Sequence, residues 1–220
     1  MNWVVNNLDL IASLTVAHLR QSAIAIVAAF VISVPLGWVA FRYTRLRGTL
    51  LTVVGLLYTV PSLGLIPLIA VALGFPILSE INFIIALTIY AVAILTRSVT
   101  DALASTDPDT RLAAVAVGFG PWRRFWQVDF PLAGPVVLAG LRVAAVSTIS
   151  LATVGILIGV QNLGYLFTNG YQRRIVEEVL TGVVAVVVIA LLIDALLVLI
   201  GRALMPWRRQ LSVRTRAATA

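Results

Sequence analysis

The sequence has no cysteine and no lysine, and only 11% of its 220 residues are charged. Without cysteine it can form no disulfide framework, no thiolate nucleophile and no cysteine metal site. One histidine alone cannot make a metal site either. Hydrophobic residues make up 60% of the chain, and a soluble domain needs far more polar surface than this. At about 20 apolar residues per crossing, the chain has room for five or six membrane helices and little else.

Apolar runs divide the chain, taken as a single transmembrane domain, into five predicted spans. The second span contains Pro61, Gly64 and Pro67, so we expect a kinked or partly unwound helix there. Asp194 is an acidic residue deep in a predicted span, where a carboxylate is costly. It can pair with Arg142, face a dimer interface or carry protons, and a structural or interface role is favoured. The predicted spans are about 21–41, 49–73, 81–100, 135–159 and 179–200, with a polar loop at 101–130 and a tail at 201–220.

All sixteen basic residues are arginines, and their distribution predicts the orientation. Positive charge accumulates on the cytoplasmic side of membrane proteins, so we expect the amino terminus outside and the carboxyl terminus inside. No cleavable signal peptide is expected. No internal repeat is visible, which disfavours the inverted-repeat secondary transporters. One side collects Arg42, Arg45, Arg47, Arg97, Arg111, Arg123, Arg124, Arg202, Arg208, Arg209, Arg214 and Arg216, and the other collects Arg20, Arg173 and Arg174.

The predicted cytoplasmic loop contains large apolar side chains at helical spacing, which we expect to share one helical face. Two interpretations stay open. The aromatic residues rest on the membrane interface, or they dock on a cytoplasmic protein whose acidic residues meet Arg123 and Arg124. The residues with this spacing are Val115, Phe119, Trp122 and Trp126.

Four ordered segments resemble the permease subunits of ATP-binding-cassette (ABC) importers, and more narrowly the osmoprotectant uptake permeases. The loop segment DPDTRLAAVAVGFG, followed by FPLAGPVVLAGLR, resembles their "EAA" loop. The other segments run from His18-Leu19 through PLG at 35–37, and then include TVPSLGLIPL at 59–68 and LATVGILIGVQNLG at 151–164. The resemblance implies an all-α integral membrane fold of about five transmembrane helices with a cytoplasmic coupling helix, the type I ABC importer permease fold.

In that family the loop forms a coupling helix that seats in a groove of a separate ATPase subunit. Leu112 stands where the family usually has Glu, which removes an expected acidic contact, and aromatic residues further along are hypothesised to compensate. A Walker A loop needs a lysine, so ATP and Mg²⁺ are expected on the partner ATPase, and this chain is expected to be no enzyme. The residues expected to face the ATPase are Leu112, Ala113, Ala114, Gly118, Trp122, Arg123, Arg124, Phe125 and Trp126.

The broken second span is the candidate transport pathway, because broken backbone in a membrane is tolerated where it lines a watery cavity. A proline kink that serves packing alone is the alternative. The face of the Tyr58 ring can attract a quaternary ammonium group. The candidate pathway residues are Tyr58, Thr59, Pro61 and Ser62.

The segment after the fourth span resembles the family's glycine-rich IGxxxLG sequence. It predicts either close helix crossing or an outer gate. The next loop is a candidate contact for an extracytoplasmic solute-binding protein, or else a solvated loop. His18, near the outer end of the first span, is expected at the membrane interface. The candidate outer residues are Gly159, Asn162, Gly164, Arg173 and Arg174.

We therefore expect a permease subunit that pairs with a second copy or a paralogue and moves glycine betaine, choline, carnitine or proline across the cell membrane. Three alternatives remain: a permease for methionine or another small solute, an ion-coupled secondary carrier, and a membrane scaffold. The sequence leaves open which solute moves, whether the dimer is symmetric and whether transport responds to osmolarity.

Overall fold

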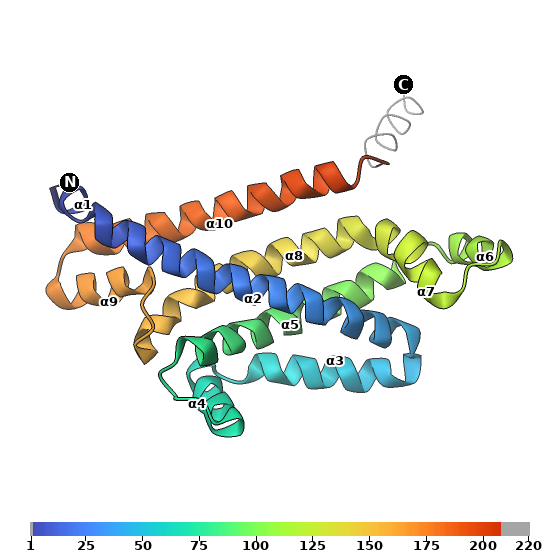
Figure 1. The fold of residues 1–220 in the computed structure, drawn as a ribbon, viewed down its shortest axis with the longest axis horizontal. Coiled ribbons are helices and arrows are strands. Elements are labelled where there is room, and N and C mark those ends of the chain that lie inside the picture. Colours follow the sequence, from blue (N-terminus) through green and yellow to red (C-terminus); the bar gives the residue numbers. More distant parts are fainter. Residues whose placement is uncertain (1, 208–220) are drawn as a thin grey trace.

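The structure, a computed structural model, describes residues 2–207, and every regular element in that range is a helix. Figure 1 shows an elongated bundle whose long helices run side by side. The helices are α1 (Asn2–Asn6), α2 (Leu8–Arg42), α3 (Thr44–Thr59), α4 (Ser62–Leu73), α5 (Glu80–Ala104), α6 (Pro108–Ala116), α7 (Pro121–Arg124), α8 (Phe130–Ala152), α9 (Gly164–Arg173) and α10 (Val176–Leu204).

Among the described residues, four helical segments are long and apolar enough to cross a membrane, and the bent pair α3–α4 makes a fifth. This confirms the predicted multi-span architecture. The first helix begins well before the predicted start at residue 21, because Leu14 continues its apolar face and packs against Leu163 and Leu166. At 35 residues, α2 is about 52 Å long, which exceeds the roughly 30 Å thickness of the hydrocarbon core.

The expected break in the second span is confirmed and lies at Val60–Pro61. The two helices meet at 110°. Val60 has the extended backbone (ψ 129°) that a following proline favours, and proline has no N–H with which to continue the helix. Pro67 lies inside α4 and does not end it. The span therefore turns sharply at one proline and is not loosened over its whole length.

Helix α5 lies at the centre of the bundle, with α2 and α8 packed against it (Figure 1). Of its most apolar 18 residues 61% are buried, against 17% for α10. Alanines fill these helix contacts, since small side chains let membrane helices approach closely. One such cluster joins Ala29 of α2, Ala91 and Leu95 of α5, and Ala144 of α8.

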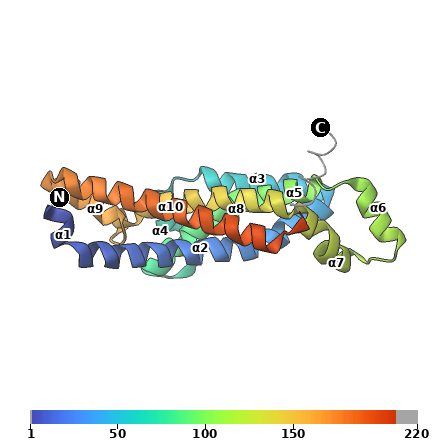
Figure 2. The ribbon, with the colours of Figure 1, turned by 90° about the horizontal axis from the view of Figure 1, so that it is seen from above.

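The region predicted as a polar loop, 101–130, is mostly helical. It holds the end of α5, then α6, then α7, which continues through a π-helical turn, η1 (Phe125–Asp129), into α8. Figure 2 shows α6 beyond the end of the bundle. The prediction that Val115, Phe119, Trp122 and Trp126 share one helical face is wrong. Helix α6 ends at Ala116 and Gly118 takes a left-handed backbone (φ 87°), so the chain changes direction between them.

Two polar contacts tie the spans together. Arg142 of α8 and Asp194 of α10 form a two-pronged ion pair, with Nε–Oδ1 2.6 Å and Nη2–Oδ2 2.7 Å. The structural pairing considered for Asp194 is thus confirmed. The interface position expected for His18 is wrong, because the imidazole is fully buried and its Nε2 lies 3.0 Å from the Ile149 carbonyl oxygen of α8.

Candidate functional site

A cavity of about 540 Å³ opens where the second span breaks. Its walls come from three places: the α3–α4 turn, the middle of α5, and the segment 147–154 at the carboxyl-terminal end of α8 and just beyond it. Hydroxyl groups and tyrosine rings supply its polarity, and no lining residue carries a formal charge. The lining residues are Tyr58, Thr59, Val60, Pro61, Ser62, Tyr90, Ala91, Ile94, Ser147, Thr148, Ser150, Leu151 and Val154.

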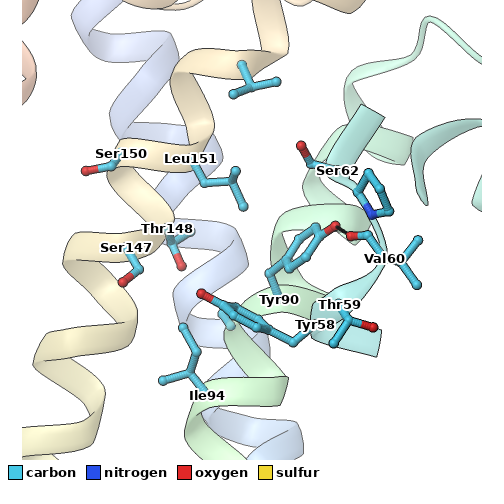
Figure 3. A pocket seen from close by; sticks show the side chains of 13 residues that line it. Tyr58, Thr59, Val60, Ser62, Tyr90, Ile94, Ser147, Thr148, Ser150 and Leu151 are labelled. Atoms are coloured by element: carbon cyan, nitrogen blue, oxygen red, sulfur yellow. Dashed lines mark hydrogen bonds between the residues drawn. The ribbon is translucent and has the colours of Figure 1, made fainter. Parts of the chain in front are cut away.

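Two tyrosine rings form one wall of this cavity. Figure 3 shows the Tyr58 ring extending from the end of α3 toward Thr148 and Ile94. The ring centroids of Tyr58 and Tyr90 lie 5.8 Å apart, and the rings cross at 77°. The Tyr90 hydroxyl donates a hydrogen bond to the Val60 carbonyl oxygen, a group that the break leaves without a helical partner. Tyr90 is therefore fixed by the break, whereas the Tyr58 ring is about half exposed (52%).

The four candidate pathway residues all line this cavity. The other polar residues of the cavity were missed by sequence reasoning, because Tyr90, Ser147, Thr148 and Ser150 lie 28 or more positions further along the chain in otherwise ordinary helices. The serine and threonine hydroxyls in the otherwise apolar helix α8 are the sequence signal that could have identified this wall of the cavity. One of them, that of Thr148, donates back to the Ala144 carbonyl oxygen at 2.7 Å.

Helix α6 lies at the tip of the molecule (Figure 2) and contains Ala113 and Ala114, the small residues of the segment that resembles the EAA loop. Asp107 caps it by accepting a hydrogen bond from the Asp109 N–H at 2.9 Å, and Pro108 starts its first turn. Leu112 is 67% exposed, and Ala113 and Gly118 are exposed as well. Ala114 faces inward and is buried. The exposed side of α6 is thus a small, weakly polar surface.

The aromatic residues after α6 form a cluster within the chain itself. Phe125 is 2% exposed and packs against Trp38 of α2 and Phe130 of α8. Its expected contact with a partner protein is therefore wrong. Trp122 packs edge-on to Trp38 with centroids 6.1 Å apart, and both Trp122 and Trp126 keep one side exposed.

The two arginines of this segment differ in their surroundings. Arg123 is exposed; its Nε donates to Gln127 Oε1 at 3.0 Å, and its guanidinium lies 4.6 Å from the Phe119 ring centroid. Arg124 instead turns inward, and its Nε lies 3.1 Å from Asp129 Oδ2. Only Arg123 is placed to meet acidic residues of another protein.

At the opposite end, Asn162 was expected at an outer gate or in contact with a binding protein; it is fully buried, so the direct contact is wrong. Its amide donates to Gln21 Oε1 at 3.1 Å and to the Ala152 carbonyl oxygen at 2.7 Å, while its Oδ1 accepts from the Gly164 N–H at 2.8 Å. Gln21 in turn donates to Glu80. Sequence reasoning missed this network, which joins α2, α5 and the end of α8.

Two glycines shape the same segment. Gly159 has a left-handed backbone (φ 81°), which ends the 3₁₀ turn η2 (Thr153–Ile158). A Cβ on Gly164 would lie 1.9 Å from the Thr153 carbonyl oxygen. Close backbone approach at Gly164 is therefore a packing requirement, as one of the two sequence interpretations held.

Arg173 and Arg174 are exposed at the end of α9. Arg174 has a left-handed backbone (φ 59°) and closes the helix. The Nη1 of Arg173 lies 4.0 Å from an oxygen of Glu178, whose carboxylate is fully buried. Among the described residues on this side, Arg20 is also exposed, but it pairs with Glu80 at 2.5 Å.

The chain is similar in sequence to several curated permeases. It is 31% identical to the osmoprotectant import permease protein OsmW of Salmonella typhimurium, over 90% of this chain and 93% of that protein. It is also 31% identical to the choline transport system permease protein OpuBB of Bacillus subtilis, over 87% of each chain. It matches 74% of its own length to the ergothioneine transport permease/ergothioneine binding protein EgtU of Helicobacter pylori, at 32% identity over 29% of that longer protein.

The fold is that of a solved permease. A chain of the MetNI methionine ABC transporter, in an inward-facing conformation, superposes with a TM-score of 0.82 over 90% of this chain and 98% of that chain, at 21% identity. Residues 29–210 match the family described as binding-protein-dependent transport system inner membrane component. This chain, with its type I ABC importer permease fold, therefore belongs to that family of membrane permease subunits.

Proposed function

We propose that this permease carries a small solute with a quaternary ammonium group, of the glycine betaine, choline and carnitine kind. The observation that carries the proposal is the cavity at the α3–α4 break, which offers two tyrosine rings and several hydroxyls and no charged side chain. A ring face attracts such a cation by about 0.5–2 kcal/mol. A contact of that strength passes the solute onward, whereas a tight site would hold it. The names of the curated relatives point to the same solute class.

Two further partners belong to the proposal. A separate ABC ATPase binds ATP and Mg²⁺ and seats against α6, while an extracytoplasmic solute-binding protein docks at the Arg173–Arg174 corner. The α6 end carries eight described arginines, and four more, Arg208, Arg209, Arg214 and Arg216, lie outside the described residues. By the positive-inside rule that end faces the cytoplasm, so the amino terminus lies outside. The host membrane is the cell membrane.

A second permease, identical or paralogous, completes the conduit. Helix α10 is 17% buried over its most apolar stretch, and one side of the cavity at Tyr58 is exposed. Two subunits facing one another enclose a solute path that one leaves open, and they present two coupling helices to two ATPase subunits.

Uptake into proteoliposomes that hold the permease, its ATPase and its binding protein tests the solute class. We expect Tyr58→Ala to lower the uptake rate of glycine betaine or choline roughly two- to thirtyfold, the range that a cation–π contact supplies. Tyr58→Phe keeps the ring face and retains most of the rate. Tyr43→Ala, an exposed tyrosine at the α2–α3 corner, serves as the matched control.

Methionine is the second candidate, since the fold is shared with a methionine transporter. The same vesicles decide between them by competition. Excess choline or glycine betaine blocks uptake of the labelled betaine and excess methionine does not. Efficient uptake of methionine, unaffected by Tyr58→Ala, would refute the quaternary-ammonium assignment.

A further inference from the structure

A buried carboxylate lies at the junction between α7 and α8. Asp129, in the π-helical turn, is 1% exposed. Its Oδ1 lies 3.3 Å from Arg111 Nε and its Oδ2 lies 3.1 Å from Arg124 Nε. A charge removed from water in this way persists only when it is paired. Arg124 belongs to the same helical segment as Asp129, but Arg111 comes from α6.

The Arg111 side chain connects α6 to three spans. Besides its pairing with Asp129, its Nη2 donates a hydrogen bond to the carbonyl oxygen of Leu103, near the end of α5. Its guanidinium carbon lies 4.6 Å from the centroid of the Phe41 ring of α2. Leu103 is fully buried. The planar guanidinium therefore joins α6 to α2, α5 and the start of α8 at one point.

Apart from Arg111, few side chains of α6 pack against the rest of the protein. Between Pro108 and Ala116, only Ala114 is buried and Arg111 half-buried. A break at 105–107 precedes the helix, and the left-handed Gly118 follows it. Figure 2 shows α6 standing beyond the bundle with α7 on its inner side. A force applied to α6 reaches the spans through the turns at its two ends and through Arg111.

We propose that the Arg111–Asp129 ion pair is the link that converts movement of α6 into movement of α5 and α8. These two helices carry Tyr90, Ser147 and Thr148 of the cavity. Arg111 and Asp129 are positioning residues, since neither lines the cavity. This inference rests on the proposed docking of an ATPase against α6, and it adds the residues through which that docking acts.

The test uses the complete complex in proteoliposomes and measures solute transported per ATP hydrolysed. Arg111→Gln leaves Asp129 with Arg124 as its partner, Asp129→Asn leaves both arginines without their carboxylate, and the double variant leaves only the Arg124 charge. We expect the double variant to assemble with the ATPase and to hydrolyse ATP, with transport per ATP reduced by at least about fivefold. It should be no worse than either single variant, because the two side chains act through each other.

Two further variants separate coupling from folding. Arg111→Lys keeps a buried positive charge but loses the planar fork, so it should fold and still transport less per ATP. Arg45→Gln, an exposed arginine of α3 at the same end of the molecule, should leave the ratio unchanged. Wild-type transport per ATP in the double variant would overturn the link.

A direct measurement of α6 position needs no transport. The chain has no cysteine, so Val115→Cys and Leu132→Cys, both at exposed positions, can carry a pair of spin labels. We expect a narrow distance distribution in the otherwise unaltered complex and a broadened one when Arg111→Gln and Asp129→Asn are added. Equal widths would refute the link. If the unaltered complex shows no ATP-driven uptake, the proposed function fails, and the label distances still decide whether this pair holds α6.

Discussion

At the scale of single residues, backbone approach and charge pairing set what this chain tolerates. Gly164 lies where the start of α9 meets the end of α8, with no room for a methyl group beside the Thr153 carbonyl oxygen. Asn162, two positions earlier, holds the same crossing through three buried hydrogen bonds. The structure gives these residues a packing role at the end of the bundle opposite α6.

Gly164→Ala should destabilise the permease by about 3 kcal/mol, because the added Cβ forces two backbone segments apart. The melting temperature of the purified complex in detergent measures this. Gly55→Ala is the matched control: Gly55 lies inside α3 with open space around it, so alanine should leave the melting temperature unchanged or slightly higher. Equal melting temperatures for the two variants would contradict the close crossing at Gly164.

The Arg142–Asp194 pair allows a second prediction. Asp194→Leu alone leaves an arginine unpaired within the spans, at a cost of about 2.5–3.5 kcal/mol, so less permease should be recovered from the membrane. Arg142→Leu with Asp194→Leu removes both charges and should restore that level together with ATP-driven uptake. A double variant that is well inserted and inactive would show that the pair does more than hold α8 and α10 together.

At the scale of elements, the breaks in the helices do most to build the site. Pro61 turns α4 away from α3 by 110° and exposes the Val60 carbonyl, which Tyr90 then binds. Gly118 separates α6 from α7 and leaves the small-residue surface of α6 at the tip. Both breaks were visible in the sequence as proline and glycine.

The turn after α6 yields a prediction. Gly118→Val strains a left-handed backbone and should abolish ATP-driven uptake while the chain stays in the membrane. Gly118→Asn tolerates that backbone better and should keep a substantial fraction of the rate. Ala114→Glu, which places a charge at a buried position, should behave like the valine variant. Full uptake by Gly118→Val would show that the orientation of α6 does not matter.

The sequence predicted the spans, the broken helix and the cavity residues from Tyr58 to Ser62, because apolar runs and prolines are local signals. It missed Tyr90, the α8 hydroxyls and the burial of Asp129. Each of these depends on which distant segments become neighbours, and a lone aspartate in a charged stretch reads as solvated. Phe125 and Asn162 were misplaced for the same reason, since their partners Trp38 and Gln21 lie far away in the sequence.

At the scale of the whole molecule, the proposed function divides transport between two proteins. This chain provides the pathway for the solute and, on α6, the surface on which a separate ATPase docks. Its scarcity of charge reflects this division, because the spans fill the chain and the charged residues gather at the two ends. With no lysine it has no Walker A loop of its own, and in the proposed function the energy for transport enters through α6. The cavity lies at the middle of α5 and at the carboxyl-terminal end of α8, and α6 lies beyond the other end of α8 and next to the end of α5, so these two helices connect them.

One measurement tests this division of labour most directly: accumulation of labelled glycine betaine or choline against its gradient, in proteoliposomes with the permease, its ATPase and its binding protein. We predict accumulation that requires ATP on the α6 side, stops when the ATPase is left out, and is unaffected when ionophores collapse the proton and sodium gradients. Gradient-driven accumulation by this chain alone, without ATPase or ATP, would contradict it.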